Sequence, residues 1–246
     1  MSQDFYRYFS LFGLIFLRKK NFEQLRLLEK DVYLFLKDIA KKNGVNPEHI
    51  KSQIYQDVFV LYILNWKRHG FFVEFGATNG LDLSNTFLLE KGFGWKGILC
   101  EPVSTWKEDL IKNRNSILNF KCVWRTSGEF LDLIVPNEPE FSNISILQNN
   151  KNLKINKLET VETISLLDLL KTNNAPRNID YLSIDTEGSE YEILKAFDFS
   201  KYKISVITCE HNYSKDREKI FKLLNKNGYE RVFQGLSRWD DWYIKL

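Results

Sequence analysis

Residues 179–194 read IDYLSIDTEGSEYEIL and contain the pattern that decides the fold. The first seven residues form a largely apolar run with the length of a buried strand, and residues 189–197 have the spacing of a helix. Asp185 ends the strand, so its carboxylate is expected at the mouth of a sheet. A strand followed directly by a helix indicates a right-handed crossover within a mostly parallel sheet.

The same alternation of strands and helices begins at Phe71 and continues along the chain. We expect strands at FFVEF, GILCE, ILNFKCVW, IDYLSID, ISVITCE and YERVF, and helices at 84–91, 104–112, 189–197 and 215–227. Residues 241–246 (DWYIKL) are expected to add an antiparallel edge strand beside YERVF. Residues 128–164 break the alternation and are read as an insertion, with a hairpin as one candidate form. The predicted fold class is α/β, with a doubly wound sheet covered on both faces.

Residues 1–69 differ from this pattern and are expected to form a helical extension before an α/β domain at 70–246. Apolar residues recur at helical spacing from Phe22 to Ile39, and a second helix is expected from His49 to Lys67. Residues 5–17 are strongly apolar, but they are too short to cross a bilayer and lack the charge order of a secretory signal. We expect a cytoplasmic protein, with membrane association as the alternative, in which residues 5–20 contact the domain, a second subunit or a membrane surface.

The composition is that of an ordinary globular protein. Of 246 residues, 43% are hydrophobic and 27% are charged, which argues against disordered, collagen-like and disulfide-framework chains. A net charge of +3 gives no support for a nucleic-acid partner, and none is expected. The three cysteines share no CxxC spacing, so no structural zinc is expected.

The loop after the first strand, VEFGATNG, has the features of a ligand site. Gly76 and Gly80 lack side chains and so allow backbone to approach a ligand closely. The loop lacks both G-x-G-x-x-G and the Lys–Ser/Thr pair of a P-loop, so a dinucleotide or a triphosphate fits poorly. Glu74, inside the motif, would repel phosphates and favours a cationic or hydroxyl-bearing ligand.

The second strand ends at a carboxylate, Glu101, about 20 residues beyond the glycine loop. A carboxylate at this point can accept hydrogen bonds from both ribose hydroxyls, so the pair of motifs predicts an adenosine-containing ligand. The predicted binding residues are Glu74, Gly76, Asn79, Gly80, Glu101 and Pro102.

Two further strand ends carry acidic residues. Asp185 and Glu187 stand at the corner after the fourth strand, and Glu210 and His211 follow the fifth. Carboxylates gathered at one corner repel one another unless they meet a cation, a metal or hydroxyl donors. Asp185, Glu187, Glu210 and His211 are therefore the predicted reaction centre, whereas the nearby Glu190 suits a ligand site and a helix cap equally well.

These motifs together resemble the S-adenosylmethionine-dependent methyltransferases of the FkbM type. The resemblance runs from about Gln56 to Trp242 and rests on VEFGATNG, SNTFLLE, WKGILCEP, SLLDLL and IDYLSIDTEGSEYEIL. It implies a Rossmann-like methyltransferase fold that binds S-adenosylmethionine. Members of the family typically methylate a hydroxyl, often on a sugar, which implies a role in glycan modification or polysaccharide biosynthesis. By the resemblance, Glu74, Gly76 and Gly80 lie at the cofactor loop, Glu101 at the ribose, and Asp185 with Glu187 at the reaction centre.

Two ways of activating an acceptor hydroxyl remain open from the residues. His211, Asp185 and Glu210 could act as general base and orienting group. Alternatively Asp185, Glu210 and Asn212 offer oxygen ligands for magnesium or manganese. The expected acceptor is a small molecule or glycan, and the side chains suited to holding a sugar are Tyr213, Trp239, Asp240, Asp241 and Trp242.

Other classes of function compete with this interpretation. A nucleotide-sugar glycosyltransferase could use Asp185 and Glu187 as a D-x-E metal site, but it leaves the Gly76 loop and Glu101 unexplained. A non-catalytic binding module on the same fold would be expected to lack the acidic centre. A nicotinamide oxidoreductase lacks its phosphate-binding fingerprint.

Overall fold

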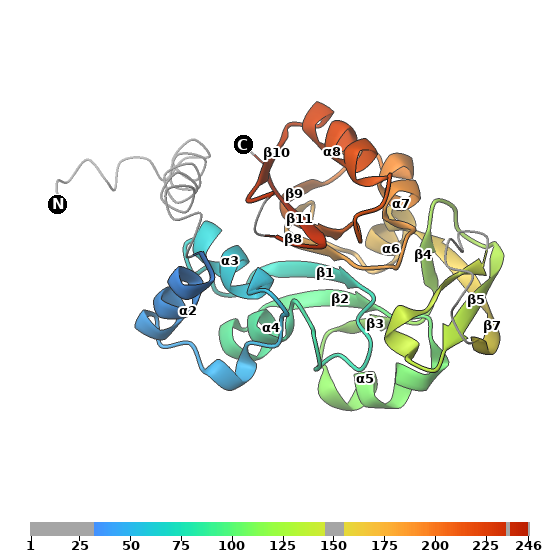
Figure 1. The fold of residues 1–246 in the computed structure, drawn as a ribbon, viewed down its shortest axis with the longest axis horizontal. Coiled ribbons are helices and arrows are strands. Elements are labelled where there is room, and N and C mark those ends of the chain that lie inside the picture. The colour runs from blue at the N-terminus through green and yellow to red at the C-terminus, as the bar shows by residue number, and fades with distance from the viewer. Residues whose placement is uncertain (1–31, 146–154, 235–236, 246) are drawn as a thin grey trace.

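The computed structural model describes residues 32–145, 155–234 and 237–245. Residues 5–20 and most of the helix expected at 22–39 lie outside the described residues. The main sheet has seven strands in the order β10-β11-β9-β8-β1-β2-β3, and the five strands from β9 to β3 are parallel (Figure 1). Its strands are β1 (Phe71–Phe75), β2 (Lys96–Cys100), β3 (Ile117–Asn119), β8 (Asn178–Ile184), β9 (Lys203–Glu210), β10 (Tyr229–Val232) and β11 (Asp240–Lys245).

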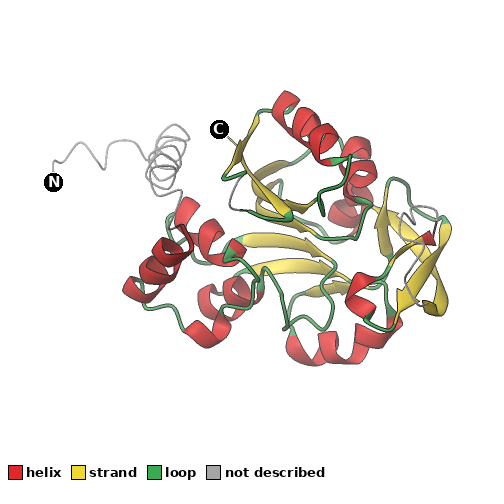
Figure 2. Ribbon diagram, viewed as in Figure 1, coloured by secondary structure: helices red, strands yellow, loops and turns green. Residues whose placement is uncertain are grey.

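Helices cover both faces of the main sheet (Figure 2), because its strands are apolar on both sides. Phe72 and Tyr181 belong to one apolar cluster, whereas the adjacent Val73 and Leu182 belong to the other. The helices of the first cluster are α2 (Val32–Lys42), α3 (Gln56–Ile63), α4 (Phe87–Phe93) and α5 (Lys107–Asn113). Those of the second are α6 (Leu166–Thr172), α7 (Glu190–Ala196) and α8 (Arg217–Lys226). The α/β fold class with a doubly wound, mostly parallel sheet is thus confirmed.

The last strand departs from the expectation in its position. β11 pairs with β10 as expected, but it lies inside the sheet between β9 and β10 and is antiparallel to both. Trp242, at the centre of β11, is fully buried and stacks on Phe59 of α3 with ring centroids 4.6 Å apart. An interior position gives this apolar strand two hydrogen-bonded neighbours and two covered faces, so β10 forms the edge instead.

Local hydrogen bonds and backbone geometry explain three further departures. The run ILNFKCVW forms two strands, because Asn119 accepts a hydrogen bond from the Lys121 amide and turns the chain between β3 and β4 (Cys122–Trp124). The second N-terminal helix begins at Gln56, because Tyr55 has a left-handed φ of 63° that cannot continue a helix. The 3-10 turn η2 (Pro47–His49) precedes it. Helix α6 was not among the expected helices and begins after Ser165, whose side chain accepts a hydrogen bond from the Asp168 amide.

The expected insertion folds as a second, smaller sheet. Its strand order is β4-β7-β5-β6, with β5 (Phe130–Pro136) antiparallel to both β6 (Asn143–Ile144) and β7 (Ile155–Ser165). The turn η4 (Pro139–Phe141) connects β5 to β6, and the turn η3 (Ser104–Trp106) precedes α5. Figure 1 shows this sheet beyond the carboxyl ends of β1, β2 and β3, which are the strand ends where ligands bind in such folds.

The N-terminal helices pack on the main sheet. All eight residues of α3 are buried, and Gln56 donates a hydrogen bond to Asp240 of β11 at 2.8 Å. Helix α2 contributes Val32, Leu36 and Ala40 to the same apolar cluster. The division of the chain at residue 70 stays a prediction. Among the described helices, none is both long and apolar enough to cross a membrane.

Candidate functional site

A cavity of about 280 Å³ opens at the carboxyl ends of β1, β2, β8 and β9. Its volume is close to the lower end of the range for small-molecule sites. Glu140, Phe141 and Asn143, from η4 and β6 of the small sheet, line it opposite these strand ends. Of the predicted site residues, those that line the cavity are Glu74, Gly76, Glu101, Pro102, Asp185, Glu187, Glu210 and Asn212.

Gly76 brings two of the predicted motifs into contact. Its φ is +72°, and a Cβ built on it would lie 1.9 Å from the carbonyl oxygen of Asp185. Only glycine fits here, because both the backbone conformation and the space exclude a side chain. The glycine loop after β1 therefore packs directly against the end of β8, where the acidic residues begin.

Asn79 and Gly80 build the loop without lining the cavity. The Asn79 side chain accepts hydrogen bonds from the amides of Leu81 and Asp82, both at 2.9 Å. A Cβ on Gly80 would meet the side chains of Leu110 and Arg114, each at 2.6 Å. Both residues shape the turn, and the structure does not bring either of them to the cavity wall.

Glu101 has the geometry expected of a ribose-binding carboxylate. One of its oxygens accepts a hydrogen bond from the Thr78 amide and the other from the Val103 amide, both at 2.9 Å. Burial raises the pKa of Glu101 to about 7. Each oxygen retains a second lone pair, so the carboxylate can still accept two hydroxyl hydrogen bonds inside the cavity. Glu101 therefore retains the acceptor capacity that its predicted role at ribose hydroxyls requires.

Glu74 is buried at the same cavity, but its carboxylate is used by the protein itself. It accepts hydrogen bonds from the Thr86 hydroxyl at 2.5 Å and the Asn85 amide at 2.7 Å. The guanidinium of Arg114 lies 3.7 Å away and also bonds to Glu90 at 3.1 Å. Burial raises the pKa of Glu74, and the Arg114 charge opposes that shift. The geometry thus gives Glu74 a clear role in holding the 84–86 turn.

Arg114 is the residue of this region that sequence reasoning missed. Its side chain is fully buried and also donates to the Gly80 carbonyl, to Ser84 and to Thr86 at 2.9–3.1 Å. It follows α5, where a lone arginine looks like an ordinary surface residue, so no sequence signal pointed to it.

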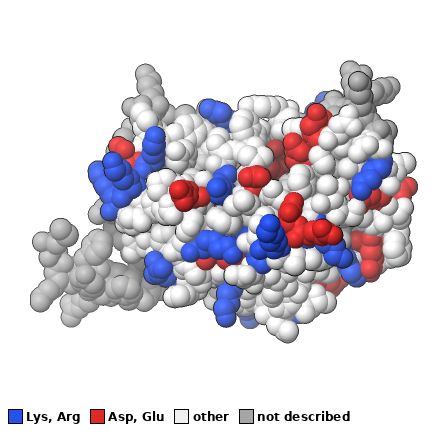
Figure 3. Space-filling view, turned by 90° about the horizontal axis from the view of Figure 1, so that it is seen from below, with Lys and Arg blue, Asp and Glu red and all other residues white. Residues whose placement is uncertain are grey.

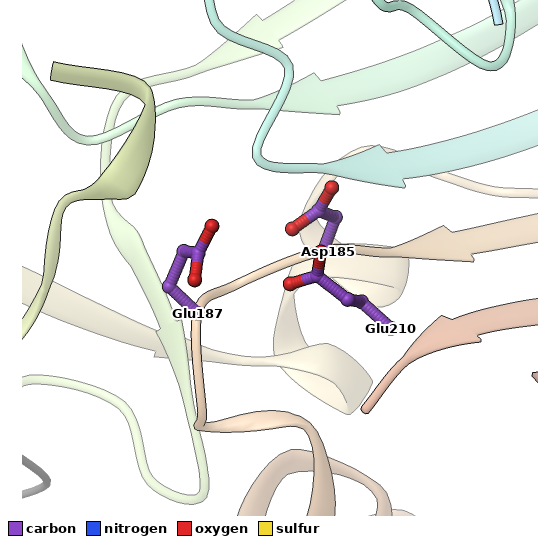
Figure 4. A group of neighbouring side chains, drawn as sticks. All are labelled: Asp185, Glu187 and Glu210. Atoms are coloured by element: carbon purple, nitrogen blue, oxygen red, sulfur yellow. The ribbon is translucent and has the colours of Figure 1, made fainter. Parts of the chain in front are cut away.

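Three carboxylates converge at the other end of the cavity. Figure 4 shows Asp185 and Glu210 at the ends of β8 and β9, with Glu187 on the loop after β8 turned toward the same space. One carboxylate oxygen from each lies within 4.8 Å of the others. The Asn212 amide donates to Glu187 at 3.1 Å and to Glu210 at 2.8 Å. The structure therefore assembles three of the four predicted reaction-centre residues.

Burial and mutual repulsion alter the acidity of this cluster. Burial, with the charges of Asp185 and Glu190, raises the pKa of Glu187 to about 8. The pKa of Glu210 lies far above its ordinary value for the same reasons, since Asp185 and Glu187 surround it. Burial also raises the pKa of Asp185, while a hydrogen bond with Glu210 lowers it. At neutral pH the cluster thus retains protons, and Glu210 can donate one to a hydrogen bond with Asp185.

Glu190 has the structural role that its sequence position allowed. Its Oε1 accepts hydrogen bonds at 3.0 Å from the amides of Thr186 and Gly188 and from the Thr186 hydroxyl. These bonds hold the loop on which Glu187 adopts a left-handed φ of 55°. Glu190 therefore positions Glu187 and is a helix-start residue, consistent with the capping interpretation.

The structure does not bring His211 into the cavity. Its Nδ1 accepts a hydrogen bond from the Tyr213 amide at 2.9 Å, and its Nε2 faces the Asp240 carbonyl at 3.2 Å and Asp241 at 3.7 Å. Burial lowers the pKa of His211. Because both ring nitrogens are engaged on the far side of β9, this geometry does not support His211 as the general base.

The expected sugar-binding side chains are also separated. Trp239 lines the cavity, and Tyr213 is 70% exposed. Trp242 is instead a core residue of β11, and Asp240 is buried against Gln56. Asp241 pairs with Arg217 at 2.8 Å and with Arg231 at 3.1 Å. The alternating sides of β11 explain why these neighbours cannot all face one ligand.

The fold is Rossmann-like, with a doubly wound sheet and a cavity at the carboxyl ends of its parallel strands. The family model described as the methyltransferase FkbM domain matches residues 74–231, which is more than half of the chain. The chain belongs to this family, which confirms the resemblance drawn from its motifs. Family membership implies S-adenosylmethionine as the methyl donor.

Two solved structures are similar to this chain. A precorrin-6y C5,15-methyltransferase from Geobacter metallireducens GS-15 is similar, with 13% identity, a TM-score of 0.42, and coverage of 81% of this chain and 90% of that one. A chain of a fibrillarin/Nop5p complex is similar with 12% identity, a TM-score of 0.37 and 72% coverage of both chains. No curated protein matches the sequence.

Proposed function

We propose that this methyltransferase transfers its methyl group to the oxygen of an acceptor hydroxyl, and that the acceptor is a sugar of a glycan or glycosylated natural product. The observation that carries the proposal is the convergence of Asp185, Glu187 and Glu210 in the same cavity that Glu101 lines. Carboxylates suit this chemistry, because a hydroxyl must lose its proton as its oxygen bonds to carbon.

The cofactor would supply an electrophilic methyl group on a positively charged sulfur. Glu101 would hold the ribose hydroxyls, and the backbone of Gly76 would allow close approach at the loop. Asp185 is the proposed acceptor of the hydroxyl proton, because it is the strand-end carboxylate that receives a hydrogen bond from Glu210. Glu210 and Asn212 would then orient Asp185 and Glu187.

A divalent cation in the acidic cluster is the second candidate means of activation. Its support is that oxygens of Asp185, Glu187 and Glu210 lie within 4.8 Å of one another, and oxygen ligands suit magnesium and manganese. Asn212 was proposed as a ligand from sequence, but here its amide nitrogen donates to two of the carboxylates. Full activity in EDTA would eliminate the metal version, and activity that returns only with a divalent ion would eliminate the simple base.

The glycosyltransferase alternative receives less support from the cavity. Among the described lining residues there is no Lys, Arg or His, so a nucleoside diphosphate would have to rely on a metal ion at Asp185 and Glu187 for all of its cationic contacts. The non-catalytic alternative is disfavoured because the acidic centre is assembled. A cytoplasmic location, and a dimer or membrane contact through residues 5–20, remain proposals from the sequence.

The first experiment is calorimetric titration of the protein with S-adenosylhomocysteine, with and without magnesium. Micromolar or tighter binding is expected. Asp185→Ala should keep this binding and lose methyl transfer to sugar acceptors. Normal turnover by Asp185→Ala would contradict the proposed reaction centre. If the protein does not bind S-adenosylhomocysteine, the glycosyltransferase and the non-catalytic binding module would be favoured instead.

A further inference from the structure

The ionisable Asp, Glu, Lys, Arg and His positions among the described lining residues of the cavity are all acidic. Its described lining residues include seven carboxylates and no Lys, Arg or His: Glu74, Asp82, Glu101, Glu140, Asp185, Glu187 and Glu210. The outer surface differs, because on the face in Figure 3 the basic and acidic side chains are interspersed. Arg114, whose guanidinium compensates the charge of Glu74, does not line the cavity.

A neutral side chain, Asn85, indicates independently that the cavity favours a ligand that donates hydrogen bonds. Asn85 is more than nine-tenths buried and lines the cavity. Its amide nitrogen donates to Ser183 at 3.0 Å, whereas its Oδ1 has no hydrogen-bond partner. A buried carbonyl oxygen without a partner is costly, so this group favours a ligand that brings a hydrogen-bond donor.

The small sheet adds a fourth carboxylate to the three of the reaction centre. Glu140 lies on η4 at the cavity, and its charge contributes to the raised pKa of Glu187. Glu140 is exposed, so the fold does not need it for packing. Glu138, in the same connection, is exposed and does not line the cavity, which makes it a matched control.

We propose that the reaction end of the cavity excludes anions, so that the acceptor is a neutral or amine-bearing polyhydroxyl compound without a phosphate or carboxylate beside the methylated hydroxyl. This inference rests on the proposed function and adds the charge class of the substrate. S-adenosylmethionine satisfies the same condition, because its amine and sulfonium outweigh its carboxylate. Like charges in a partly desolvated site repel strongly enough to change affinity by about tenfold or more.

The test measures charge selection without knowledge of the acceptor. Adenosine, adenosine 5′-monophosphate and 5′-amino-5′-deoxyadenosine are tested as competitors of S-adenosylhomocysteine. They differ in the charge of the 5′ substituent, which takes the place of the sulfur in S-adenosylhomocysteine. The amino compound should displace best and the monophosphate at least about tenfold worse than adenosine. Glu140→Lys should reduce the difference in affinity between adenosine and the monophosphate several-fold, whereas Glu138→Lys should leave that difference unchanged.

The outcomes separate this inference from the function on which it rests. If S-adenosylhomocysteine binds but the monophosphate competes as well as the amino compound, charge selection is wrong and the methyltransferase site stands. If S-adenosylhomocysteine does not bind, the proposed function and the inference fall together. Faster methyl transfer to a uronate than to its neutral methyl glycoside would also overturn the inference.

Discussion

Glu74 and Glu210 are buried carboxylates on strands of the same sheet, yet their surroundings are opposite. Glu74 faces a buried arginine and three hydrogen-bond donors. Glu210 faces Asp185 and Glu187, with one amide donor from Asn212. The first arrangement compensates the charge within the fold, and the second holds protons on carboxyl groups that face a cavity. The comparison separates a carboxylate used for structure from carboxylates available to a ligand.

The largest effect is expected where the compensated region is broken. Arg114→Met would leave Glu74 buried without a cationic partner and would leave Glu90 with Lys91 alone, at a cost of about 3–5 kcal/mol in the free energy of unfolding. Urea unfolding measures this loss. Arg125→Met is the control, because Arg125 is exposed and its contacts are a long one to Glu192 at 3.7 Å and one over the ring of Trp124 at 5.2 Å. Equal losses in the two variants would show that Glu74 does not depend on Arg114.

The contact between the two regions gives the next largest effect. Gly76→Ala places a methyl group 1.9 Å from the Asp185 carbonyl oxygen, so β1 and β8 must separate. We expect a loss of about 2–4 kcal/mol in unfolding free energy, measured by thermal denaturation. Gly128→Ala has a similar φ of +79° and no atom within 4 Å, and it should cost only about 1 kcal/mol. A Gly76 variant that behaves like its control would contradict the tight approach.

Glu101 is intermediate between the two cases, since backbone amides are its only hydrogen-bond donors among the described residues. Glu101→Ala should weaken S-adenosylhomocysteine binding by about 10- to 100-fold, because two ribose hydroxyls lose their acceptor. Calorimetry measures the change. Glu159→Ala removes a nearby carboxylate that bonds to Ser104 and does not line the cavity, so binding should persist. Unchanged affinity in Glu101→Ala would place the ribose elsewhere.

The smallest effect concerns the uncompensated cluster and depends on pH. The pKa of Glu187 is raised to about 8 in the folded protein. The protonated carboxyl therefore stabilises the fold fully at a pH below the ordinary pKa of glutamate, and this contribution to the free energy of unfolding is lost as the pH rises through 8. Glu187→Gln cannot ionise, so without metal it should melt a few degrees higher than the parent protein at pH 9. The advantage should shrink toward pH 5, where the carboxyl is protonated. Melting curves that keep a constant separation across this range would contradict the repulsion.

The sequence predicted the sheet well because each strand is short, apolar and followed by a recognisable helix. The acidic residues at the strand ends could be predicted to lie close together, because the carboxyl ends of parallel strands meet at one edge of the sheet. His211 could not be placed, because one residue past the end of β9 the backbone turns and Asn212 takes a left-handed φ of 43°. Arg114 and Glu140 were also beyond reach, since long-range packing alone brings them to the cavity region.

The interior position of β11 has a consequence for how a growing chain folds on the ribosome. Every other strand of the main sheet is synthesised before Asp240–Lys245. Until that segment emerges, β9 has an open edge beside the strand that carries Glu210, and β10 has no partner in the sheet. Open edges invite pairing with other chains. The nascent protein therefore depends on its latest-made strand both to close the sheet and to escape aggregation, so a stall just before Asp240 should expose it to chaperones.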